Sequence, residues 1–107
     1  MAEFDAVLKY SELLDLYQNL LSETQREVLE DYYCYNLSLS EIAENRHITR
    51  SAVEDAIKKG KKKLDEYEIK ISSLKALQLI RKIKSDTSDP KILADLDEVE
   101  RIMKHGI

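Results

Sequence analysis

Five lysines within six positions are the residues of this sequence best suited to binding chemistry. They are Lys58, Lys59, Lys61, Lys62 and Lys63. A lysine ammonium group binds phosphate as a point charge and carries no information about base sequence. On a helix the run would encircle the axis, so two or three lysines can face a single polyanion. The run therefore predicts contact with a nucleic-acid backbone, with a solvated helix surface as the alternative.

Arg50 and Ser51 form a second candidate binding group, at the start of the segment that leads into the lysines. In helix-turn-helix proteins that read DNA, the N-terminal end of the second helix contacts base edges. Glu54 and Asp55 follow on the exposed side, and their carboxylates would repel phosphates. The sequence leaves two interpretations open here, contact with a duplex or a structural or protein-binding surface.

Few residues of the sequence are suited to catalysis. His47 and His105 are far apart, and no cysteine or carboxylate set has the spacing of metal ligands. Cys34 lies among tyrosines, where we expect it to be packed rather than reactive. Two glycines are too few for a phosphate-binding loop. The sequence therefore predicts a protein that is not an enzyme, with no metal and no cofactor.

The lysines stand out against an acidic chain, whose 107 residues carry a net charge of −4. Residues 1–57 hold 4 basic and 12 acidic side chains, residues 58–84 hold 10 and 3, and residues 85–107 hold 3 and 6. An acidic chain repels nucleic acid at long range, so a nucleic-acid contact must be local to the basic middle segment. The alternative is that the segments neutralise one another within the fold or across a dimer.

Composition indicates that helices position these residues. Apolar residues make up 43% of the chain and charged residues 36%, with only 2 Gly and 1 Pro. The single cysteine cannot form an internal disulfide, and no apolar run is long enough to span a membrane. Glu3 and Asp5 do not fit a signal peptide. We expect an all-α protein of the cytoplasm with no membrane span.

Apolar periodicity and capping residues predict the first helices of the chain. The first covers residues 5–20. A second begins after Ser22, which has capping-box spacing to Gln25, and ends near Tyr35.

Further caps predict a short third helix and a long fourth one. Ser38 and Glu41 form another capping box, which starts a helix at Leu39. Thr49 is the N-cap of a fourth helix, which we expect to continue past Tyr67.

Two amphipathic helices are predicted at the C-terminal end, after a joint at Ser72–Ser73. Asp89 caps the second of them, with Pro90 at its first position. Their apolar stripes must pack on the rest of the chain or on a second copy in a homodimer. The stripes consist of Leu74, Leu77, Ile80 and Ile83, and of Ile92, Leu96, Val99 and Met103.

The third and fourth helices have the spacing of a helix-turn-helix. This motif needs a small residue in its first helix, a tight turn and an apolar residue that locks the second helix. Ala43 is the small residue, Ile48 fills the turn, and Val53 follows ten residues after Ala43. His47 occupies a turn position where left-handed glycine is common, and Arg46 one where an apolar residue is frequent. An undifferentiated helical bundle is the alternative.

On these residues the chain resembles two families. Residues 24–57 resemble region four of bacterial sigma factors, and residues 10–70 more closely resemble the YlxM family. The sigma-like residues are Arg26-Glu27-Val28-Leu29, the run from Leu37 to Ala43, Thr49-Arg50 and Val53. The YlxM-like residues include Leu16-Tyr17-Gln18, Leu20-Leu21, Gln25-Arg26, Tyr32-Tyr33, the run from Ser38 to Ala43, Ala52-Val53, Asp55, Ile57, Leu64 and Glu66-Tyr67-Glu68. The sequence departs from the YlxM pattern at Lys61–Lys63, which are more basic, and at Glu54, where the family often has an aromatic residue.

The YlxM resemblance implies a non-catalytic accessory or regulator of the signal recognition particle, with the particle's RNA or its GTPases as partners. We expect a helix-turn-helix domain at residues 1–70, similar to sigma region four, and a helical extension at residues 71–107 that packs on the core or on a dimer partner. One alternative is a DNA-binding transcriptional regulator that uses Arg50, Ser51 and Lys58 on a duplex. Another is a protein-only interaction module.

Overall fold

The protein is built from helices joined by short turns. The computed structural model describes residues 3–105, and those residues contain no strand. The elements are α1 (Phe4–Tyr17), the 3₁₀ turn η1 (Gln18–Leu20), α2 (Glu23–Leu29), the π-helical segment η2 (Glu30–Cys34), α3 (Leu39–Arg46), α4 (Arg50–Ile71), α5 (Ser73–Asp86) and α6 (Pro90–His105). The predicted all-α class is confirmed. None of the helices in this described part is long and apolar enough to cross a bilayer.

Side-chain caps start four helices where the sequence predicts them. At α6 the cap is Asp89, whose Oδ1 accepts a hydrogen bond from the Lys91 N–H at 2.9 Å. Ser22 Oγ accepts a hydrogen bond from the Gln25 N–H at 3.2 Å, and Thr49 caps α4 in the same way at 3.0 Å. Ser38 and Glu41 form the full capping box, because each side chain accepts a bond of 3.1 Å from the other residue's N–H. These bonds satisfy backbone donors that have no partner inside the helix.

Three joints between helices use a left-handed residue that is not glycine. Asn36 lies between η2 and α3, His47 between α3 and α4, and Ser72 between α4 and α5, with φ of 54°, 55° and 58°. Such a conformation costs about 1–2 kcal/mol outside glycine, so the packing of the flanking helices must stabilise each joint. The predicted turn at His47 and the predicted joint at Ser72 are confirmed.

The first two predicted helices change their pitch near their ends. The helix predicted over residues 5–20 is α-helical to Tyr17 and then tightens into η1. The second predicted helix widens into η2 after Leu29. The apolar period of 3.6 residues predicts that a segment is helical but does not predict local changes of pitch. Changes to a π-helix are also rare in proteins.

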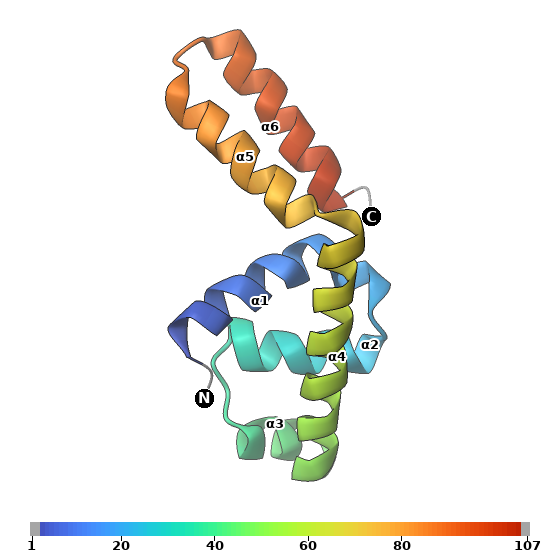
Figure 1. Ribbon diagram of the computed structural model, residues 1–107. Helices are drawn as coiled ribbons and strands as arrows, with labels where there is room; N and C mark the ends of the chain where they lie inside the picture. Colours follow the sequence, from blue (N-terminus) through green and yellow to red (C-terminus); the bar gives the residue numbers. More distant parts are fainter. Residues whose placement is uncertain (1–2, 106–107) are drawn as a thin grey trace.

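A small apolar cluster locks the helix-turn-helix at the lower end of the molecule (Figure 1). Val28 from α2, Ile42 from α3 and Val53 from α4 are fully buried against one another. Ala43 and Ile48 pack against them. The predicted contacts of the motif are therefore confirmed, and α3 and α4 are separate helices.

A larger cluster joins α1 to α2, η2, α4 and α5. Its buried members are Tyr10, Leu13, Leu14, Leu16, Tyr17, Leu29, Tyr33, Leu64, Leu74 and Leu77. Gly60 of α4 is buried beside it, where α2 crosses α4. A Cβ at Gly60 would lie 2.5 Å from Leu29 Cδ1 and 3.2 Å from Leu29 Cγ. The one glycine of the lysine run is therefore a packing requirement.

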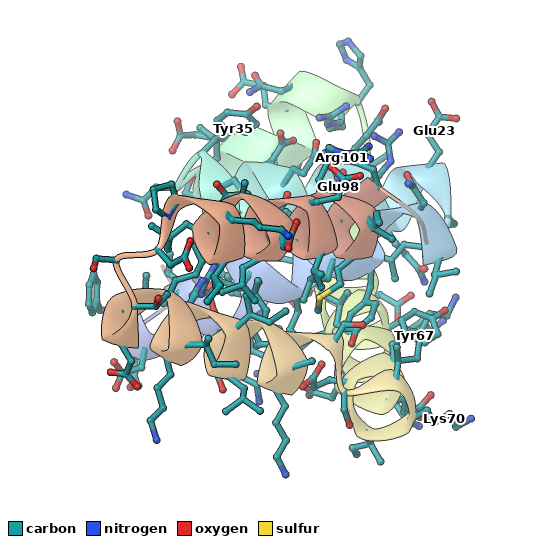
Figure 2. All side chains as sticks on the ribbon, turned by 90° about the horizontal axis from the view of Figure 1, so that it is seen from above. Glu23, Tyr35, Tyr67, Lys70, Glu98 and Arg101 are labelled. Atoms are coloured by element: carbon teal, nitrogen blue, oxygen red, sulfur yellow. The ribbon has the colours of Figure 1, made fainter. Side chains whose placement is uncertain are left out.

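Helices α5 and α6 form an antiparallel hairpin at the upper end of α4 (Figure 1). Seen from above, the two helices lie side by side with α1 behind them, and the Glu98–Arg101 ion pair lies along α6 (Figure 2). Arg81 of α5 pairs with Glu12 of α1 at 2.9 Å, and residues of α6 also contact α1.

The direction of α5 is set by one carboxylate at the end of α4. Glu68 Oε1 accepts hydrogen bonds from the Leu74 N–H at 3.0 Å and the Tyr17 hydroxyl at 2.7 Å. Glu68 Oε2 accepts one from the Lys75 N–H at 3.1 Å, and the Tyr17 oxygen accepts one from the Ser73 N–H at 2.9 Å. Glu68 and Tyr17 therefore cap α5 from outside it.

The apolar stripes of the hairpin are buried only in part. Leu74 and Leu77 of α5 are buried, whereas Ile83, Ile92 and Val99 remain 42–43% exposed. Of the stripe predicted for α6, Leu96 and Met103 are half-buried, whereas Ile92 and Val99 are exposed. The half-buried side of α6 also includes Leu93, Glu100 and Lys104. A domain boundary at residue 70 stays a prediction.

Gly60→Ala is expected to lower the free energy of unfolding by about 1–2 kcal/mol, although alanine favours a helix, because the new methyl meets Leu29. Urea denaturation measures the change. Leu29→Val removes the atom that the methyl meets, so the double variant should lose less than the sum of the single variants. A more stable Gly60→Ala protein would contradict close packing at this crossing.

Candidate nucleic-acid interface

The seven predicted binding residues all lie on α4, but they face different directions. Gly60 faces the core, so the lysines on either side of it must face outward or sideways. Ser51, Lys58 and Lys62 lie on the outward face and are exposed. We call these three residues the outward face of α4.

Two lysines of the run are turned toward other helices. Lys61 Nζ lies 5.1 Å from the centre of the Tyr10 ring, a cation–π contact. Lys63 Nζ donates a hydrogen bond to Gln25 Oε1 of α2 at 3.1 Å. The expectation that only part of the run faces one surface is consistent with these contacts, and its role in binding stays a prediction.

Carboxylates pair with two cations in the first three turns of α4, Arg50 and Lys59. Arg50 Nε lies 3.5 Å from Glu54 Oε1, and Lys59 Nζ lies 3.1 Å from Asp55 Oδ2. All four side chains are more than half exposed, so each pair contributes less than about 1 kcal/mol to stability. Within residues 3–105, Lys58 and Lys62 have no carboxylate partner. The net positive charge of the outward face therefore lies on these two lysines.

A pocket of about 330 Å³ opens beside this face, where η2, α3 and α4 meet. We call it the tyrosine pocket. Its lining residues are Tyr32, Tyr33, Leu39, Glu54, Ile57, Lys58 and Lys61. The sequence alone does not predict this pocket, although its four α4 residues have the spacing of one helix face.

Packed tyrosine rings form one wall of the tyrosine pocket. The Tyr33 ring centre lies 4.9 Å from that of Tyr32, edge to face, and 5.2 Å from that of Tyr10. Burial raises the pKa of Tyr33 to about 12. The Tyr10 hydroxyl donates to the Asp65 carboxylate at 2.9 Å, and burial followed by this bond raises the pKa of Tyr10. Both hydroxyls therefore stay protonated at neutral pH.

Arg46 has a structural role that the sequence did not reveal. It donates hydrogen bonds to both Asp31 oxygens, at 2.8 and 3.1 Å, and to Glu27 at 2.8 Å. Asp31 is only 7% exposed, so this pairing compensates a nearly buried charge. Arg46 thereby ties α3 to η2 and to α2. The sequence shows an arginine at a position of the motif where an apolar residue is frequent. It does not show the partners of this arginine, because Glu27 and Asp31 lie far from Arg46 along the chain.

A second pocket, of about 320 Å³, lies between α1 and η2 and includes Cys34. Cys34 is exposed, so the expectation that it is packed is wrong. Desolvation is the largest cause of a raised pKa of its thiol, so the thiol is not activated as a nucleophile. In the described part of the chain, no group of three His, Cys, Asp or Glu side chains could hold a metal ion. His47 is part of the turn of the motif and His105 lies at the end of α6.

These features define a helix-turn-helix protein: a small residue and an apolar lock hold two short helical segments across a tight turn. The chain belongs to the UPF0122 family of YlxM / p13-like helix-turn-helix proteins, which it matches over residues 4–104. The predicted family is thereby confirmed.

Relatives at 35–40% identity match nearly the whole chain. A UPF0122 protein of Malacoplasma penetrans is 40% identical over 97% of this chain and 98% of its own length. One from Fusobacterium nucleatum is 39% identical over 94% and 95%, and one from Shouchella clausii is 35% identical over 94% and 96%. Their names state the family and no activity.

The buried tyrosines give an expected pH dependence. Because the folded-state pKa of Tyr33 is raised, its contribution to stability is present below pH 10 and is lost as the pH rises toward 12. Tyr33→Phe should make the fall in unfolding free energy between pH 9 and 11 smaller by about 1 kcal/mol. Urea denaturation at both pH values measures the fall. Tyr35→Phe is the matched control, because that ring is 67% exposed, and it should leave the wild-type fall unchanged.

Proposed function

We propose that this protein is a non-catalytic accessory of the signal recognition particle in the cytoplasm and that it binds the particle's RNA. The contact runs through the outward face of α4, with Lys58 and Lys62 on backbone phosphates. The association with the particle comes from the resemblance to the YlxM family. The RNA contact is supported by the free charge of these two lysines beside a neutralised helix start.

The charges at the start of α4 favour a backbone contact over the reading of duplex bases. Arg50 is the side chain best placed to reach a base edge, and its partner Glu54 would have to release it first. Asp55 adds a second carboxylate close to where a phosphate would lie. Lysines bind phosphates without reading sequence, so Lys58 and Lys62 suit an RNA backbone as partner.

Replacement of both lysines tests this function. Lys58→Ala/Lys62→Ala should weaken binding of the particle's RNA at least tenfold at low salt. It should also reduce the slope of log affinity against log salt by about 0.7–0.9 for each lost phosphate contact. Titrations at two salt concentrations measure both effects. Lys75→Ala/Lys82→Ala changes the net charge equally on exposed positions of α5, and it should bind as the wild type does.

The same titrations separate the alternative functions. Specific binding to duplex DNA that exceeds RNA binding would support a transcriptional regulator and overturn the proposal. Binding to the particle's GTPases that survives loss of both lysines would support a protein-only module.

We also propose a homodimer through the exposed apolar side of the hairpin. The exposed side chains Ile83, Ile92 and Val99 support it, since an amphipathic hairpin can bury such residues on a second copy. Light scattering at high micromolar concentration should give about twice the monomer mass of 12.4 kDa. Val99→Glu should give the monomer mass. A wild-type protein at the monomer mass would contradict the dimer.

A further inference from the structure

We propose that the tyrosine pocket binds one unpaired nucleobase of the RNA, and that it selects a base with an exocyclic amino group, such as cytosine. This inference rests on the proposed RNA-binding function and deepens it. The sugar and phosphate of the same nucleotide lie at the mouth of the pocket, against Lys58 and Lys61.

The walls of the tyrosine pocket suit a flat aromatic ring. Tyr32 is half-buried and is held edge to face against the buried Tyr33 ring. Leu39 and Ile57, both half-buried, add apolar surface from α3 and α4. Proteins that bind single-stranded RNA stack bases on tyrosine rings of this kind and surround them with positive charge.

The charges around the pocket fit a nucleotide better than an uncharged apolar group. Lys61 is positioned by the Tyr10 ring at one side, and Lys58 belongs both to the pocket and to the outward face. An RNA strand whose phosphates contact Lys62 and Lys58 can therefore turn one base into the pocket while those contacts are kept. The backbone contact and the base contact are thus adjacent.

Glu54 supplies the selectivity at the mouth. A carboxylate accepts hydrogen bonds and cannot donate them when ionised, so it pairs with the amino group of cytosine. Uracil presents a carbonyl oxygen at the same position, which a carboxylate repels. Glu54 is paired with Arg50 at 3.5 Å in an exposed ion pair, and a carboxylate has acceptor positions on both oxygens, so Glu54 can accept from a base amino group while this pair is kept.

An unpaired base is required because side chains of η2, α3 and α4 line the pocket, so a base enters it only after it has turned out of a stack. A base inside a duplex would have to leave its stack and its partner, which costs a few kcal/mol, whereas a loop or bulge base is already available. The proposed ligand is therefore a single-stranded segment, loop or bulge of RNA.

Two single-stranded RNA oligonucleotides of equal length and charge test the inference, one of cytidines and one of uridines. The wild-type protein should bind the cytidine strand about tenfold more tightly, the effect of one charge-assisted hydrogen bond at a partly exposed site. Glu54→Gln should bring the ratio of the two affinities close to one. Asp55→Asn removes the same charge one position away, outside the pocket, and should keep the wild-type ratio.

Tyr32 tests the stacking contact separately. Tyr32→Leu keeps an apolar side chain but removes the ring, and it should weaken binding of both strands about fivefold or more. Tyr32→Phe keeps the ring and should bind as the wild type does. Circular dichroism and thermal melting establish that both variants are folded. A variant that does not fold is replaced by one whose side chain is closer in size to tyrosine.

The outcomes distinguish the inference from the function on which it rests. Salt-dependent binding that needs Lys58 and Lys62, with equal affinity for the two strands, would overturn the base pocket and leave the backbone contact standing. The same holds if Tyr32→Leu and Tyr32→Phe bind alike. Failure of the wild-type protein to bind either strand or the particle's RNA would overturn both.

Discussion

The close approach of α2 to α4 at Gly60 is the constraint on which the other features of this protein depend. Leu29 occupies the space that a side chain at Gly60 would need, and this crossing orients α4 about its own axis. Once Gly60 faces inward, the pitch of the helix fixes the direction of every lysine around it. The same crossing joins the core under α1 to the small cluster of the helix-turn-helix. The directions of the lysines and the packing of the two clusters therefore both depend on this contact.

The cations of α4 differ in whether a carboxylate pairs with them. Glu54 and Asp55 pair with Arg50 and Lys59. Lys58, which lies between the members of these pairs along the chain, and Lys62, one turn further along, have no carboxylate partner in the described part of the chain. Helix-turn-helix proteins commonly place positive side chains on DNA at the start of the second helix. In this chain the unpaired lysines of the outward face lie beyond the first turn of α4. The fold alone does not fix the partner, which depends on these individual side chains.

The sequence predicts what is determined by near neighbours and misses what is determined by distant ones. The caps at Ser22, Ser38 and Thr49 and the left-handed turn at His47 are local features, and the sequence locates each of them. The requirement for Gly60 depends on a leucine 31 positions earlier, and Arg46 depends on partners in another helix. The tyrosine pocket needs three elements to meet, so no single segment of sequence reveals it.

Helix α4 spans the molecule from the helix-turn-helix to the hairpin as one continuous element of 22 residues. Its length is about 33 Å, and Glu68 fixes the hairpin rigidly to its far end. Because α1 and α2 pack along this length, α4 does not tilt on its own. A ligand that changes how α3 and α4 cross would have to move the core around Gly60 before any displacement reached the hairpin.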